Sequence, residues 1–180
     1  MEDNHLSLPL FLQTCFKNIQ DNVKTEGIFR ISPKLVDINA FCNEINKSSN
    51  CSALKPEMAI GIVKRFLKSL PTPLLGAGAW HLMKSLTTST FEEKHKKIYE
   101  YVNSLPECNK FMLKHLFCLF DFIDKNKECN KMDYSNLSIV LAPNFLWGES
   151  SLHEMFQDSL AAVEFVNFLL VNHLTLLDYI

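Results

Sequence analysis

Apolar residues recur along this chain every three or four positions, as on one face of a helix, and nowhere alternate strictly with polar residues as in a strand. The first such segment covers residues 8–22, where Leu12, Cys15, Phe16 and Ile19 share one helical face. Further helices are expected over residues 32–46, 56–70, 80–85, 90–103, 107–124, 133–141 and 151–172, the last with a break somewhere within it. We therefore predict an all-α fold, a helical bundle of about eight or nine helices.

Several residues predict where these helices begin and end. Ser32-Pro33 has the sequence of a helix start, since serine can cap free N–H groups and proline suits the first turn. Thr90 with Glu93, and Ser151 with Glu154, match the capping box. Pro143 is expected to stop the helix that precedes it. Residues 24–31 lack helical signals and are interpreted as a connection.

Length and composition favour an ordinary globular domain. We expect residues 1–180 to form one domain, a piece of a longer protein and a monomer. The formal net charge of −2 gives no reason to expect a nucleic-acid partner. The apolar run at residues 165–177 is too short for a transmembrane segment, and the six cysteines fit reduced thiols better than a disulfide framework. These features predict a cytoplasmic protein, recruited to membranes, if at all, by other domains of its parent.

Common catalytic motifs are missing from the sequence. It contains no G-x-x-x-x-G-K-[ST] or G-x-G-x-x-G loop to hold phosphates, no G-x-S-x-G nucleophile and no H-E-x-x-H metal site. Glu92 and His95 supply only half of a helical carboxylate–histidine site. We therefore expect no metal ion and no cofactor bound by the chain itself.

Three polar features stand out from the helical pattern. Of the 18 lysine and arginine residues only two are arginines, and Arg30 lies in the predicted connection rather than on a helix. Lys64 and Lys68 are four residues apart and share one helix face. Asn144 directly follows Pro143 between apolar neighbours. Taken singly, these features also fit an ion-paired surface arginine, a solvated helix face and a local turn cap.

Together, in this order, they resemble the RhoGAP (BCR-homology) domain family over nearly the whole chain. Residues 26–32, EGIFRIS, are similar to the family's E-G-I-F-R-x-S signature. Residues 63–75, VKRFLKSLPTPLL, resemble its L-K-x-F-L-R-E-L-P-E-P-L-L segment. Residues 130–132, NKM, and 136–146, NLSIVLAPNFL, resemble its N-K-M and N-L-A-x-V-F-A-P-N-L-L segments. Three separated blocks with compatible spacing favour the family over the single interpretations above.

The resemblance implies a GTPase-activating protein, an activator rather than an enzyme in its own right. Its partner would be a Rho-family small GTPase in the GTP-bound state, and that partner would carry GTP and Mg²⁺. Arg30 matches the family's arginine finger, the arginine inserted into the partner's active site, and Glu26, Gly27 and Phe29 would support the loop that carries it. Lys64, Lys68 and Asn144 match positions that bind the GTPase, with lysine at position 68 where the family usually has arginine.

Two other functions remain open at this level. Some relatives of the family bind GTPases or other signalling proteins without accelerating hydrolysis, usually after losing the arginine finger, which this chain retains. A helical scaffold unrelated to GTPases is compatible with composition and helix content, although the three ordered blocks disfavour it.

Overall fold

The computed structural model describes residues 6–48, 54–148 and 154–177, and within them it contains ten helices and no strand, which confirms the all-α prediction. The helices are α1 (Leu10–Asp21), α2 (Leu35–Ser48), α3 (Pro56–Ser69), α4 (Ala79–Ser85), α5 (Phe91–Asn103), α6 (Glu107–Asp124), α7 (Lys127–Asn130), α8 (Tyr134–Phe145), α9 (Met155–Val171) and α10 (His173–Leu176). The count exceeds the expected eight or nine chiefly because α7 is a single turn with no apolar periodicity of its own.

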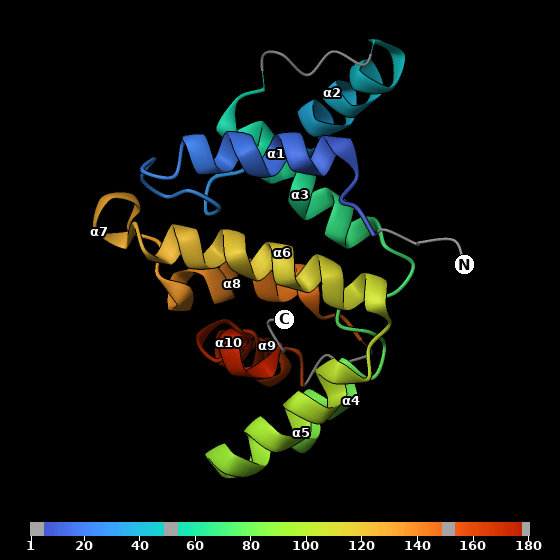
Figure 1. Cartoon of the computed structure of the whole chain (residues 1–180), viewed down its shortest axis with the longest axis vertical. Coiled ribbons are helices and arrows are strands. Elements are labelled where there is room, and N and C mark those ends of the chain that lie inside the picture. The colour runs from blue at the N-terminus through green and yellow to red at the C-terminus, as the bar shows by residue number, and fades with distance from the viewer. Residues whose placement is uncertain (1–5, 49–53, 149–153, 178–180) are drawn as a thin grey trace.

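The long helix α6 runs through the middle of the molecule, with α1, α2 and α3 toward one end and α4 and α5 toward the other (Figure 1). Its buried face, which includes Leu113, Leu116 and Phe120, contributes to a single apolar core that draws on nearly every helix. Helices α8 and α9 pack along each other, and α1 packs on α3. Helix α3 also contacts α2 and α8, so these elements form one continuous body around α6.

Several helix ends fall where the sequence predicted them. Thr90 accepts the N–H of Glu93 at 3.3 Å and donates its own N–H to the Glu93 carboxylate at 3.1 Å, a complete capping box at the start of α5. Pro56 opens α3, and α6 has the predicted bounds. Helix α9 ends at Val171, close to the predicted end at residue 172, and the break expected within this helix does not occur between Met155 and Val171.

Two predicted helix ends are wrong. Helix α2 begins at Leu35 rather than at Ser32-Pro33, because the Ser32 hydroxyl accepts a hydrogen bond from Lys64 instead of capping a helix. Pro143 lies inside the last turn of α8, which ends only at Phe145. Proline has no N–H to donate to the carbonyl of Ile139, so one helical hydrogen bond is lost there, and the helix continues for only two more residues. The predicted cap at Ser151 lies outside the described residues.

A membrane-spanning helix must be both long and apolar. Helix α9 has 17 residues, and no helix in the described ranges is both long and apolar enough to cross a bilayer. No disulfide joins cysteines within those ranges.

Candidate functional site

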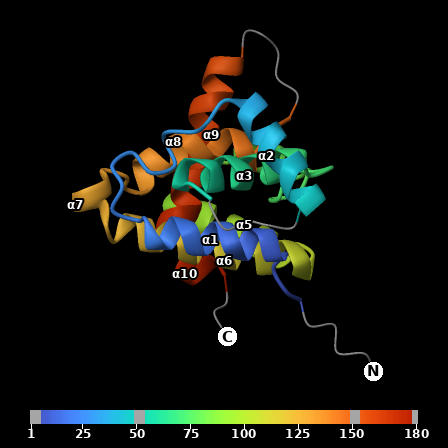
Figure 2. The same ribbon diagram turned by 90° about the horizontal axis from the view of Figure 1, so that it is seen from above.

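Residues 22–34 connect α1 to α2 through consecutive tight turns. The N–H of Gly27 donates to the carbonyl of Asn130 at 2.8 Å, and the carbonyl of Gly27 accepts the N–H groups of Arg30 at 2.9 Å and Ile31 at 3.2 Å. Gly27 has a φ of 73°, a left-handed conformation that costs glycine little. The connection passes beside α7 in both views (Figures 1 and 2), and the hydrogen bond to Asn130 holds it there.

Phe29 fixes this loop to the core. Its side chain is completely buried, and its ring meets that of Phe120 edge-on with centroids 5.3 Å apart. Phe29 also has a φ of 66°, which costs a non-glycine residue about 1–2 kcal/mol. Burial of a phenylalanine side chain stabilises a fold by about 1.5–3 kcal/mol, and an aromatic pair adds about 0.5–1.5 kcal/mol. The packing of Phe29 therefore outweighs the strain of its backbone.

Because Phe29 points inward from a left-handed turn, Arg30 next to it is exposed. Arg30 makes no ion pair with any residue that the structure describes, so the interpretation as an ordinary ion-paired arginine has no support there. Its guanidinium lies over Gly27, where a Cβ would come within 3.2 Å of Nη2. The small residue at position 27 therefore leaves room for the arginine as well as for the turn.

Lys64 reaches the same loop from α3. Its Nζ donates to the carbonyl oxygen of Phe29 at 2.5 Å and to Oγ of Ser32 at 3.0 Å, and it lies 5.9 Å from the centre of the Phe29 ring. Burial lowers the pKa of the Lys64 amine below its usual value of 10.5. The amine thus ties together the residues on both sides of Arg30.

Lys68, one turn along α3, engages the end of α8 instead. Its Nζ donates to the carbonyl oxygen of Pro143 at 2.6 Å and lies 5.1 Å from the centre of the Trp147 ring. The Asn144 amide donates to the carbonyl of Val140 at 3.0 Å, a capping bond within its own helix of the kind that the sequence left open. Helix α3 therefore connects the Arg30 loop, through Lys64, with the Asn144 segment, through Lys68.

Glu26, which the sequence singled out as a support for the loop of Arg30, makes the fewest hydrogen bonds among the candidate residues of this site. Its side chain is exposed, and it forms no hydrogen bond or ion pair within the described part of the chain. Two residues that contact the site were not singled out, namely Asn130, which accepts the Gly27 N–H, and Trp147 beside Lys68. The N-K-M block contains Asn130, but only the fold shows that this block lies against the loop of Arg30.

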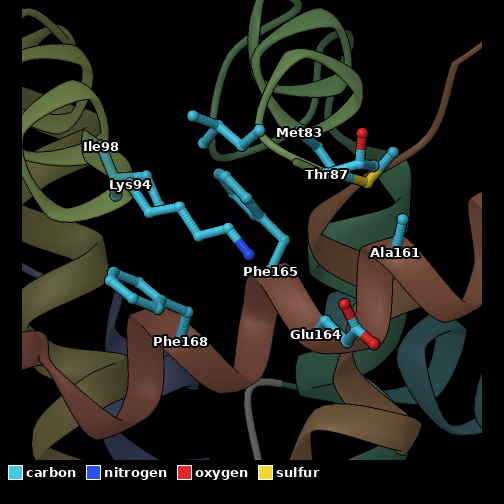
Figure 3. Close-up of a pocket in the computed structure, with 9 residues that line it drawn as sticks. Met83, Thr87, Lys94, Ile98, Ala161, Glu164, Phe165 and Phe168 are labelled. Atoms are coloured by element: carbon cyan, nitrogen blue, oxygen red, sulfur yellow. The ribbon is translucent and has the colours of Figure 1, made fainter. Parts of the chain in front are cut away.

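A separate pocket lies between α4, α5 and α9, lined by residues that include Lys94, Phe165 and Phe168 (Figure 3). None of the candidate residues described above lines it. The described residues also contain no group of three or more histidine, cysteine or acidic side chains placed to hold a metal ion. The polar side chains around Arg30 lie outside this pocket, and Arg30 itself is exposed, as suits contact with another macromolecule.

Known proteins with similar sequences include several Rho GTPase-activating proteins. The chain is 29% identical over 140 residues to Rho GTPase-activating protein 11A from Homo sapiens, covering 77% of the chain and 14% of that protein. It is 29% identical over 176 residues to Rho GTPase-activating protein 68F from Drosophila melanogaster, covering 93% of the chain and 36% of that protein. The human T-cell activation Rho GTPase-activating protein is 31% identical over 136 residues, 74% of the chain and 19% of that protein. The chain thus spans about a third or less of the length of these relatives.

Solved structures agree on the fold. The BH domain from Graf, the GTPase regulator associated with focal adhesion kinase, matches with a TM-score of 0.82 at 20% identity, covering 94% of each chain. Human Rho GTPase activating protein 15 matches with a TM-score of 0.81 at 20% identity, covering 93% of this chain and 83% of the other. The sequence profile of the RhoGAP domain matches residues 9–150, most of the chain. The resemblance seen in the sequence is therefore confirmed, and the chain belongs to the RhoGAP domain family.

Proposed function

We propose that this chain stimulates GTP hydrolysis by a Rho-family small GTPase, switching it to the GDP-bound state, and that Arg30 is the arginine finger. The observation that carries the proposal is an exposed arginine without an ion pair among the described residues, next to a completely buried Phe29. Such an arginine is available to a partner, while its backbone is held by the core. Membership of the RhoGAP family and relatives named as Rho GTPase-activating proteins support the same function.

The proposed mechanism is electrostatic. During GTP hydrolysis negative charge grows on the β–γ bridging and γ oxygens, and a free small GTPase stabilises that charge incompletely. An arginine supplied by another protein places a delocalised positive charge there and excludes water. The general size of this effect, about 10³–10⁵ in kcat, corresponds to about 4–7 kcal/mol of the activation barrier.

In this proposal the partner carries the nucleotide, the Mg²⁺ ion and the glutamine that orients the attacking water. The chain therefore needs no phosphate loop, metal site or nucleophile, and it acts as an activator that completes another protein's active site. It would act as a monomer in the cytoplasm, reaching membranes through other domains of its parent protein.

The neighbouring polar residues would hold the loop of Arg30 in place and bind the GTPase. Lys64 already donates two hydrogen bonds to the finger loop, so it would hold that loop in place and offer its remaining N–H to the GTPase. Lys68 would set the position of Asn144 through the carbonyl of Pro143, and Asn144 would bind the partner near its switch region. Lysine lacks the planar fork of arginine, but a single carbonyl acceptor requires only one donor.

The test is single-turnover GTP hydrolysis by a panel of Rho-family GTPases, together with binding to their GTP-loaded and GDP-loaded forms. The wild-type chain should accelerate hydrolysis by at least one GTPase and prefer its GTP-loaded form. Lys34→Ala is the control for Arg30→Ala, since it removes one exposed positive charge four residues away. GTP-dependent binding without acceleration by the wild type on any GTPase would instead indicate a non-catalytic RhoGAP-like module.

A further inference from the structure

The side chain of Asn130 is completely buried and uses all of its hydrogen-bonding groups. Its Nδ2 donates to the carbonyl oxygens of Val23 and Ile123, each at 2.9 Å. Its Oδ1 accepts the N–H of Met132 at 2.8 Å. A primary amide, with two N–H donors and one oxygen, matches this set of two carbonyls and one N–H. An apolar side chain would leave the Val23 carbonyl and the Met132 N–H without these partners, while the Ile123 carbonyl would keep the N–H of Asn126.

These bonds join three separate segments at one point. Val23 belongs to the exit from α1, Ile123 to the last turn of α6, and Met132 to the approach to α8. The backbone of the same residue also binds the loop, because its carbonyl accepts the N–H of Gly27 at 2.8 Å. Gly27 in turn accepts the N–H of Arg30 at 2.9 Å, so only two backbone hydrogen bonds separate Asn130 from the arginine.

We propose that Asn130 is a positioning residue for the arginine finger, acting through Gly27 rather than by contact with the GTPase. This inference rests on the proposed function of Arg30. The buried amide fixes the Asn130 backbone against α1 and α6, and the carbonyl of that backbone then fixes where the turn carrying Arg30 begins. Lys64 holds the other end of the same turn through Phe29 and Ser32. The finger is therefore held at both ends by residues far away in the sequence.

Positioning has a kinetic signature that a merely structural role lacks. Misplacing a catalytic group by about 1 Å can cost about 10²-fold in rate, while the rest of an interface continues to bind. Removing the Asn130 amide should therefore lower the maximum rate reached at saturating chain concentration. The concentration needed for half-saturation should change much less, because Asn130 is buried and cannot touch the partner.

The experiment compares Asn130→Ala with Ile98→Ala, which creates a cavity at a completely buried core position on α5, apart from α7 (Figure 1). Both variants are checked by thermal unfolding, and single-turnover hydrolysis is then measured well below their unfolding temperatures over a range of chain concentrations. We expect Asn130→Ala to lose about 10²-fold in maximum rate with half-saturation within about threefold of wild type. Ile98→Ala should keep the maximum rate. Equal maximum rates for the two variants would overturn the proposal.

If Asn130→Ala does not fold, Asn130→Ser, which keeps one donor and one acceptor, takes its place. If neither folds, hydrogen exchange of the wild-type chain decides: the amides of Gly27 and Met132 should be protected to a similar degree. Exchange of the Gly27 amide as fast as that of an open loop would overturn the proposal. Should the wild-type chain not stimulate any GTPase, the proposed function fails separately, and the exchange measurement still tests whether Asn130 holds the loop.

Discussion

Replacing Phe29 with alanine removes the side chain that fixes the Arg30 loop to the core. Phe29 is completely buried, so its removal costs the transfer of a whole aromatic side chain and leaves a cavity beside Phe120. Such truncations typically cost about 3–5 kcal/mol. Alanine does not relieve the strain of the left-handed backbone, since it too carries a Cβ. We therefore expect the full loss of about 3–5 kcal/mol in the free energy of unfolding, measured by urea denaturation.

A loss of stability alone does not show that Phe29 serves Arg30, so the assay needs a matched control. Phe165 is also buried, but it lies on α9 and lines the pocket away from Arg30. Phe165→Ala should lose similar stability yet keep the maximum rate of single-turnover hydrolysis within about twofold, whereas Phe29→Ala should lose about 10–100-fold. Both are measured at a temperature where each variant is folded. Equal maximum rates for the two variants would refute the idea that the core anchor positions the finger.

Three further changes test individual contacts of the site. Gly27→Ala should lower the free energy of unfolding by about 1–2 kcal/mol, measured with urea, because alanine is strained at a φ of 73°. It should also reduce stimulation of hydrolysis, because the added Cβ would lie 3.2 Å from Arg30 Nη2. Unchanged stimulation would contradict this. Lys68→Met should raise the half-saturating concentration, because methionine cannot donate a hydrogen bond to the carbonyl of Pro143. Lys68→Arg, which keeps a donor, should not raise it, as a titration of hydrolysis rates would show. Burial lowers the pKa of Lys64, so between that lowered value and 10.5 the unfolded chain binds more protons than the folded chain. The free energy of unfolding of the wild type should therefore rise with pH relative to that of Lys64→Met. A difference between the two free energies of unfolding that stays constant across this pH range would contradict the reasoning.

The helices were predictable from local sequence because their signals are local. The capping box of Thr90 and Glu93 and the placement of Pro56 involve residues within one turn of each other. The two errors arose where a distant residue intervened or where position within a helix mattered. Ser32 could cap a helix, but Lys64 from another helix takes its hydroxyl, and Pro143 could stop a helix, but it lies where little of α8 remains.

The candidate site was only partly predictable for a related reason. Arg30 stood out because it is one of two arginines and lies between helices, and the family resemblance supplied a role for it. The sequence does not show that Lys64 donates to the carbonyl of Phe29 or that Asn130 accepts the N–H of Gly27, because these pairs are far apart along the chain. Nor does local pattern predict that Phe29 adopts a left-handed conformation, which only its packing in the folded core makes favourable.

The central claim is that Arg30 acts in the transition state of the partner's reaction. The most direct test is the maximum single-turnover rate of GTP hydrolysis, at saturating chain, for wild type and Arg30→Ala on the GTPase that the wild type stimulates best. The account predicts a loss of about 10³-fold or more for Arg30→Ala, with much of the binding to the GTP-loaded form retained. A maximum rate for Arg30→Ala equal to that of the wild-type chain would contradict it.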